Sequence, residues 1–140
     1  MKKVLYLFIS IILLKNVFSQ QNNYSVSGNI IFKKGDFLSQ EKLKSDRLTT
    51  FTVIAVRGKV RKPINSKKVN LIELRNNKKN TIFITRTNQN SQFKFNLKSG
   101  IYTFFILKGD SIYSNIFDGE GYFKSHRIIQ NTNGVSIIED

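Results

Sequence analysis

The amino-acid sequence predicts an all-β protein, folded as a β-sandwich of about seven to nine strands. Composition and hydrophobic patterning support this prediction. Strand-forming residues dominate the apolar set, with 12 Phe and 5 Tyr against a single alanine, Ala55. Between Val69 and Leu107, four apolar runs are separated by polar turns. Four strands within about forty residues is the spacing of sandwich proteins.

Residues 1–19 have the pattern of a secretory signal peptide. Lys2-Lys3 supplies positive charge at the start, and Val4–Leu14 supplies a continuous apolar run. Small or branched residues follow in Val17–Ser19, so cleavage is expected after residue 19. The apolar run is shorter than the ~20 residues that cross a bilayer. We therefore expect a secreted, periplasmic or cell-surface protein with no transmembrane anchor after cleavage.

Residues 20–48 are predicted to form one strand followed by a polar loop. Tyr24–Phe32 carries apolar residues at roughly alternate positions around Gly28, which indicates a strand. Lys33–Arg47 is polar and mixed in charge, with room for one helical turn. The sandwich domain is expected to occupy residues 49–140.

This domain is predicted to begin with a long strand and then a pair of strands. Phe51–Val60 is largely apolar, and its Gly58 indicates a bulge or the close approach of another backbone. Val69–Leu74 and Thr81–Arg86 are predicted to pair with each other, because the polar segment Arg75–Asn80 can join them as a loop.

The clearest alternation in the chain lies in Phe93–Lys98. Its three apolar side chains fall on every second residue, so an extended backbone directs all of them to one face. Ile101–Leu107 begins directly after Ser99-Gly100 and is apolar on both faces, as expected of a central strand. We predict that the two strands are antiparallel neighbours, joined by a tight turn that uses the conformational freedom of glycine.

Asp118–Gly121 is predicted to be an ordinary hairpin turn. With Asp110, it gathers the few clustered carboxylates of the chain, and a calcium loop needs more of them at fixed spacing. Lys108 and Lys124 flank the turn and are expected to supply the opposing charge. The remaining predicted strands are Ile112–Phe117, Tyr122–Ile129 and Val135–Ile138.

Five short motifs follow one another along the chain: Gly58-Lys59-Val60, Pro63-Ile64, Val69-Asn70-Leu71, Thr87–Phe93 and Ser99–Tyr102. In order and spacing they resemble carboxypeptidase regulatory-like domains of the stand-alone, secreted bacterial type. The resemblance covers roughly residues 51–107. It implies a transthyretin-like (prealbumin-like) Greek-key β-sandwich and says little about function, because one fold serves many functions.

The turn before Phe93 departs from the pattern of that family. Asn88 and Ser91 stand where the family usually has an aspartate and a glycine. Asparagine tolerates a left-handed backbone better than serine does. We therefore expect Asn90 to adopt the left-handed conformation in this turn.

The sequence offers little that could carry catalysis. His126 is the only histidine, so neither a two-histidine zinc site nor the zinc centre of a carboxypeptidase can be assembled. A nucleophile elbow, a phosphate-binding glycine loop and cysteine are all lacking from the sequence. We predict a protein that is not an enzyme and needs no cofactor, with His126 at the surface or on an edge strand.

Positive charge is the remaining functional signal, since the formal net charge is +14. A basic patch could contact carbohydrate or an anionic envelope polymer. The alternative is codon bias in an AT-rich genome. We favour codon bias, because aromatic residues do not interleave with the basic ones, and for the same reason we expect no nucleic-acid partner. The candidate contact residues are Lys59, Arg61, Lys62, Lys67, Lys68, Arg75, Lys78 and Lys79.

The sequence therefore predicts a secreted or envelope-associated, non-enzymatic β-sandwich module. Its expected role is structural or in protein–protein interaction, with an unknown envelope protein or glycan as partner. The alternative role is binding of carbohydrate or polyanionic polymer through a basic end of the sandwich. Salt dependence separates the two roles, and the oligomeric state stays open.

Overall fold

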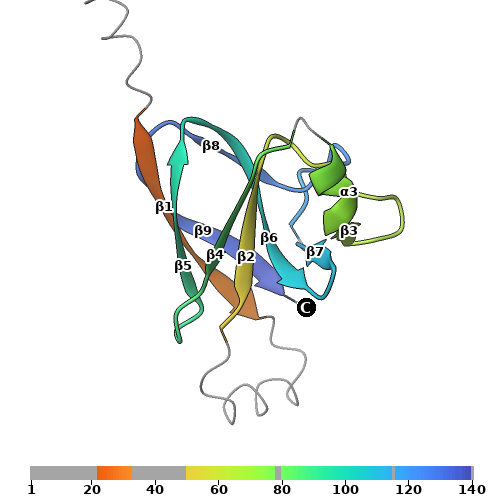
Figure 1. Ribbon diagram of the computed structural model, residues 1–140, viewed down its shortest axis with the longest axis horizontal. Helices are drawn as coiled ribbons and strands as arrows, with labels where there is room; N and C mark the ends of the chain where they lie inside the picture. The colour runs from red at the N-terminus through yellow and green to blue at the C-terminus, as the bar shows by residue number, and fades with distance from the viewer. Residues whose placement is uncertain (1–21, 33–49, 78–79, 115, 140) are drawn as a thin grey trace, which may run out of the picture.

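The computed structural model describes residues 22–32, 50–77, 80–114 and 116–139. These residues form nine strands and one short helix, and the strands lie in two sheets that pack as a sandwich (Figure 1). The prediction of an all-β sandwich is confirmed. The predicted signal peptide, residues 1–19, and the predicted polar loop, residues 33–47, lie outside the described residues.

The smaller sheet has three strands, and β1 (Asn23–Phe32) is the central one. On one side β1 pairs antiparallel with β5 (Gln92–Lys98), so that Ser27 lies opposite Lys94. On the other side it pairs in parallel with β9 (Thr132–Glu139). A strand that comes early in the sequence is therefore built into the same fold as residues 49–140.

The larger sheet has six strands, and the longest, β6 (Gly100–Lys108), lies at its centre. One side of β6 pairs through its middle with β2 (Thr52–Arg57), which in turn pairs with β4 (Ile82–Arg86). The other side of β6 is shared by two short strands. The remaining members of the sheet are β3 (Lys68–Asn70), β7 (Ser111–Tyr113) and β8 (Ser125–Ile128).

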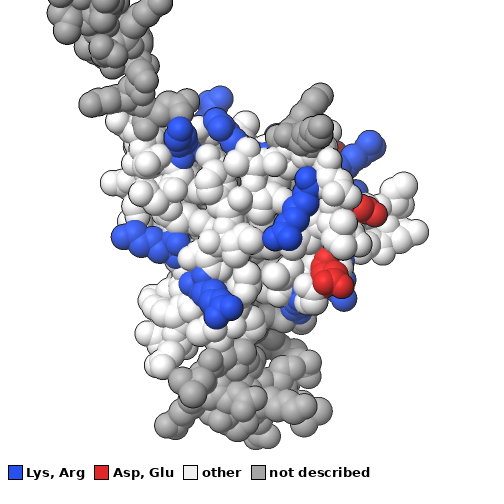
Figure 2. All heavy atoms as spheres, viewed as in Figure 1, with Lys and Arg blue, Asp and Glu red and all other residues white. Residues whose placement is uncertain are grey.

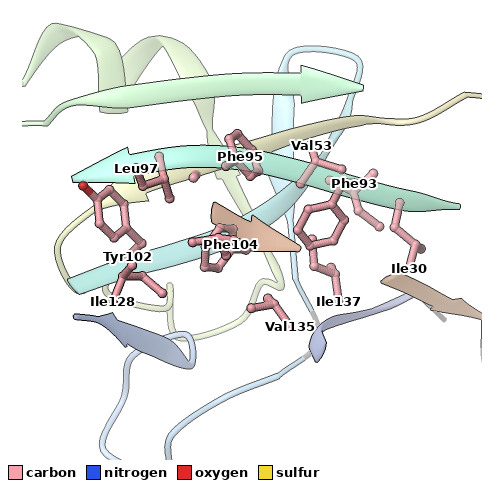
Figure 3. Close-up of a cluster of buried hydrophobic side chains, with 13 residues drawn as sticks. Ile30, Val53, Phe93, Phe95, Leu97, Tyr102, Phe104, Ile128, Val135 and Ile137 are labelled. Atoms are coloured by element: carbon pink, nitrogen blue, oxygen red, sulfur yellow. The ribbon is translucent and has the colours of Figure 1, made fainter. Parts of the chain in front are cut away.

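The main core lies between the two sheets. From β5, the side chains of Phe93, Phe95 and Leu97 all point inward, while the residues between them are exposed. Figure 3 shows Phe104 of β6 facing the two phenylalanines, with ring centroids 6.2 Å from Phe93 and 5.8 Å from Phe95. Burying a phenylalanine side chain contributes about 1.5–3 kcal/mol. The alternation predicted for β5 is therefore confirmed, and it supplies one wall of this core.

A second apolar core covers the opposite face of the larger sheet. Ile54 of β2 and Phe105 of β6 point into it, and the ring of Phe123 packs edge-on against Phe105 at 5.0 Å. Both faces of β2 and β6 are thus buried, which confirms that Ile101–Leu107 belongs to a central strand. The buried members of this cluster are Ile54, Val56, Val60, Leu71, Phe105, Ile112 and Phe123.

The predicted hairpin of β5 and β6 is wrong. Both strands form where expected, but β5 pairs with β1 in the smaller sheet and β6 pairs with β2 in the larger one. The junction at Ser99-Gly100 carries the chain from one sheet to the other. The apolar faces of β5 and β6 therefore meet across the core, as the ring contacts of Phe104 show.

The predicted strand Val69–Leu74 is also wrong beyond its first residues. The chain is extended only in β3 and then forms α3 (Leu71–Asn76). Asn70 caps this helix, because its Oδ1 accepts a hydrogen bond from the backbone N–H of Ile72 at 2.8 Å. Leu71 and Leu74 lie three residues apart, so both reach the second core from one face of the helix.

This helix removes the predicted partner of β4. The β4 strand pairs with β2, and β3 pairs with β7 instead. Figure 1 shows α3 close to β3 and β7, which form one end of the larger sheet. Within the described part of the chain, no helix is long and apolar enough to cross a membrane.

Several predicted strands end earlier than the apolar pattern suggests. The strand predicted over Phe51–Val60 stops at Arg57, because Gly58 turns the chain with a φ of +110°. Close backbone contact occurs here as predicted, since the N–H of Gly58 donates to the carbonyl of Ile101 at 2.7 Å. Likewise Ile112–Phe117 shortens to β7 and Tyr122–Ile129 shortens to β8.

In the turn before Phe93, Ser91 adopts the left-handed conformation with a φ of +58°, so the prediction for Asn90 is wrong. The reason is the side chain of Asn88. Its Oδ1 accepts hydrogen bonds from the N–H groups of Asn90 at 3.0 Å and Gln92 at 2.9 Å. Since these two bonds fix the backbone on both sides, the residue between them must turn.

Candidate functional site

The predicted basic residues are spread over one side of the larger sheet and its connections. Arg61, Lys68 and Arg75 are exposed, in the segment before Pro63, at the start of β3 and in the last turn of α3. On the face shown in Figure 2, lysine and arginine side chains stand singly and do not gather into one patch. Lys67 is exposed beside Lys68, and Lys78 and Lys79 lie outside the described residues.

Lys59 already has partners within the molecule. Its Nζ lies 3.7 Å from a carboxylate oxygen of Glu120 and 3.9 Å from one of Asp118. The same nitrogen is 5.5 Å from the centre of the Tyr122 ring. Ion pairs this exposed contribute little to stability, because water and salt screen them. They still compete with any external anion for Lys59.

Lys62 is held in a similar way. Its Nζ lies 4.5 Å from the centre of the Phe117 ring, the distance of a cation–π contact. The backbone N–H of Lys62 also donates to the carbonyl of Gly121 at 2.9 Å, and the N–H of Phe123 donates to Val60. The segment around residue 61 is therefore bonded to the segment around residue 122.

The acidic turn is stabilised from inside by Asp118. Its Oδ1 accepts hydrogen bonds from the backbone N–H groups of Glu120 at 2.8 Å and Tyr122 at 3.1 Å. Desolvation raises the pKa of Asp118, but these two N–H groups and the charge of Lys59 outweigh it and hold the pKa below its usual value. An ordinary turn, as predicted, accounts for this geometry.

The cation that pairs with both carboxylates of the turn is Lys59, whereas the sequence pointed to Lys108 and Lys124. Lys108 lies instead with its Nζ 4.7 Å from the centre of the Tyr113 ring. Among the described residues, no three His, Cys, Asp or Glu side chains lie close enough together to hold a metal ion.

His126 is partly buried on β8, which pairs only with β6 among the described strands. Its ring stands edge-on to Phe104 with centroids 5.7 Å apart. Burial, and secondarily the charge of Lys124, lower the pKa of His126 below its usual value. This favours a neutral imidazole that packs against the core.

A polar groove lies elsewhere, and the sequence did not indicate it. It has a volume of about 600 Å³ and is formed by the middle of β1, the start of β5, the end of β4 and Gly134 of β9. None of the eight predicted basic residues lines it. The lining residues are Ser27, Gly28, Asn29, Thr85, Arg86, Asn88, Gln92, Phe93, Lys94 and Gly134.

The sequence signal for this groove was incomplete. Alternation in Phe93–Lys98 places Gln92 and Lys94 on the outward face, and the pattern around Gly28 does the same for Ser27. What alternation cannot reveal is that β1 and β5 are neighbours, because their residues are far apart in the chain.

Comparisons of the chain with protein-family models, with curated proteins and with solved structures found no match.

Proposed function

We propose that this protein is a secreted or envelope-associated, non-enzymatic β-sandwich module that acts in protein–protein interaction. The leader-like pattern of residues 1–19 and the resemblance to carboxypeptidase regulatory-like domains support this proposal. The side chains that a hydrolase would use are also occupied in structural contacts. Asp118 bonds its own turn, and His126 packs against Phe104.

The observation that carries the proposal is the free edge of β4. Among the described strands, β4 is hydrogen-bonded on one side only, to β2. Ile84 lies in the middle of this strand and is 52% exposed, although its cross-strand partner Ile54 is fully buried. An open strand edge next to an exposed apolar side chain is the surface to which an extended segment of another protein adds as a further strand.

Paired substitutions test this role. Ile84→Lys places a charge on the open edge, and Ile72→Lys places the same charge on α3, where Ile72 is similarly exposed at 57%. The wild-type protein and the two variants serve as baits in envelope extract. We expect the Ile84→Lys bait to retain at least about tenfold less of the principal partner than wild type does, which corresponds to a loss of about 1.4 kcal/mol of binding free energy. The Ile72→Lys bait should perform as wild type. Equal capture by all three baits would contradict an interaction at β4.

The second candidate function is binding of carbohydrate or polyanion through the basic residues near Pro63. The exposed side chains of Arg61, Lys68 and Arg75 favour it, whereas the internal partners of Lys59 and Lys62 weaken it. A triple change of the three exposed residues to Gln should reduce retention on an immobilised anionic polymer and flatten its dependence on salt. Unchanged retention of the triple variant would show that this end of the sandwich is not the binding site for the polymer.

A further inference from the structure

We propose that the polar groove formed by β1, β4 and β5 binds an acidic saccharide, a sugar chain that carries carboxylate groups. The groove includes Thr85 and Arg86 at the end of β4, but neither Ile84 nor any of the basic residues near Pro63 lines it. The inference does not depend on either function proposed above. It rests on which side chains line the groove and on what they leave unbonded.

The centre of the groove is a block of four outward side chains on two paired strands. Ser27 lies opposite Lys94, and Asn29 lies opposite Gln92. Paired residues on one face of a sheet have Cβ atoms about 4.5–5.5 Å apart. The four polar groups therefore stand side by side on a rigid surface.

The side chains at this surface are mainly hydrogen-bond donors. Arg86 and Lys94 line the groove, and neither makes a side-chain hydrogen bond or ion pair with another described residue. Gln92 receives a hydrogen bond on its Oε1 from the Nδ2 of Asn88 at 2.9 Å, so its NH₂ group stays available. Not one of the ten lining residues is acidic. A ligand rich in acceptors and negative charge complements such a surface.

The groove is already shaped without a ligand. Gly28 and Gly134 add no side chain to it, and a Cβ at Gly28 would overlap the carbonyl oxygen of Val135. The Oγ of Ser27 donates to the Oδ1 of Asn133 at 2.8 Å, which fixes that hydroxyl group. Binding to a preformed site avoids much of the entropic cost of ordering loops.

Size and polarity point to a saccharide. A volume of about 600 Å³ falls within the range that holds a small organic ligand and exceeds what one inorganic anion fills. Asn29 offers both a donor and an acceptor, the combination that matches sugar hydroxyl groups. The only aromatic residue in the lining, Phe93, is 3% exposed and faces the core. Hydroxyl and carboxylate groups find several hydrogen-bond partners among the lining side chains.

Calorimetric titration of the purified protein with a trigalacturonate tests the inference. The matched neutral probe is a galactose trisaccharide, and inorganic phosphate is a second anionic probe. We expect trigalacturonate to bind at least about tenfold more tightly than either. Arg86→Gln and Lys94→Gln should each weaken that binding by about tenfold or more, since a charge-assisted hydrogen bond is lost.

Lys98→Gln is the matched control, because Lys98 is exposed on β5 and lies outside the groove. It should bind trigalacturonate within about twofold of wild type. Arg86→Gln, Lys94→Gln and Lys98→Gln all change exposed side chains, so their melting temperatures should equal that of wild type. A loss of binding therefore cannot be ascribed to unfolding. Ile84→Lys should also bind trigalacturonate normally, because Ile84 does not line the groove, and this separates the groove from the interaction proposed at Ile84.

Three results would overturn the inference. Absence of trigalacturonate binding, or equal binding of the neutral trisaccharide, would show that carboxylates are not recognised. If Lys98→Gln and Lys94→Gln lost equal affinity for trigalacturonate, the ligand would be attracted only by the overall positive charge of the protein. Phosphate binding as tight as trigalacturonate, with the same response to the variants, would assign the groove to small inorganic anions.

Discussion

Phe95 and its neighbour Lys94 show how sharply one residue step changes the environment in β5. Phe95 is 6% exposed in the main core, whereas Lys94 is exposed on the other face. Phe95→Asp should unfold or aggregate the protein, because it buries an unpaired charge and removes a core aromatic ring. Lys94→Asp should change the free energy of unfolding by about 0.5 kcal/mol or less. Urea unfolding of both variants checks this, and similar midpoints would show that the register is misassigned.

At this scale the sequence predicts faces better than backbone conformations. Strict alternation in β5 identifies its buried side chains without any knowledge of neighbouring strands. The conformation of Ser91 is different, because it depends on hydrogen bonds that the side chain of Asn88 makes in the folded turn. Residue preference alone favoured Asn90, and local bonding overruled it.

At the scale of single elements, α3 depends on its capping residue. Asn70→Ala removes the side-chain acceptor for the N–H of Ile72 and should lower the free energy of unfolding by about 1 kcal/mol. Asn76→Ala, at the exposed end of the same helix, should have a smaller effect or slightly stabilise the helix. Chemical denaturation measures both, and an equal loss in the two variants would argue against capping.

The turn at Asp118 predicts a dependence of stability on pH. Because the pKa of Asp118 is lowered in the folded protein, its contribution is fully present above the ordinary value of 3.8 and is lost as pH falls through the folded pKa. Asp118→Asn keeps an acceptor for the N–H groups of Glu120 and Tyr122 but carries no charge. Its stability should therefore fall less than that of wild type below about pH 4.

Urea unfolding at several pH values checks this expectation. Asp118→Ala is the matched comparison, since it removes the acceptor together with the charge. It should be less stable than Asp118→Asn at every pH. If the stability of Asp118→Asn depended on pH in the same way as that of wild type, the carboxylate charge would not stabilise the turn.

The sequence predicted where most strands lie, but it predicted less well which strands pair with each other. Apolar runs located β5 and β6, but an apolar face does not reveal whether its neighbour lies beside it in the sheet or across the core. Val69–Leu74 was misassigned for a related reason. Its leucines at positions 71 and 74 suit one face of a short helix, and the capping by Asn70 decides for that helix.

At the scale of the whole molecule, we expect folding to be independent of metal ions. The chain contains no cysteine, and Lys59 pairs with both carboxylates of its acidic turn. Thermal melts in EDTA and in millimolar Ca²⁺ should therefore coincide. A rise of several degrees in Ca²⁺ would contradict the ordinary turn and indicate a calcium-binding loop.

The arrangement of the whole molecule was predictable only in outline. Composition and spacing indicate a sandwich, and the apolar pattern of Ile101–Leu107 indicates a strand buried on both faces. The groove requires β1 to lie beside β5, and that pairing depends on how the entire chain packs. The sequence identified the basic residues. It did not show that Lys59 contacts Glu120 or that Lys62 contacts the ring of Phe117.

The central position of β1 also sets the order in which the protein can fold during synthesis. Its Ser25 is bonded to Asn131, 106 residues further along the chain. A ribosome therefore releases β1 long before β9 exists, and until then the smaller sheet has at most two strands, which are marginally stable alone. Contacts between such distant segments slow folding. The nascent chain must keep one flank of β1 unpaired, and open to aggregation, until β9 emerges.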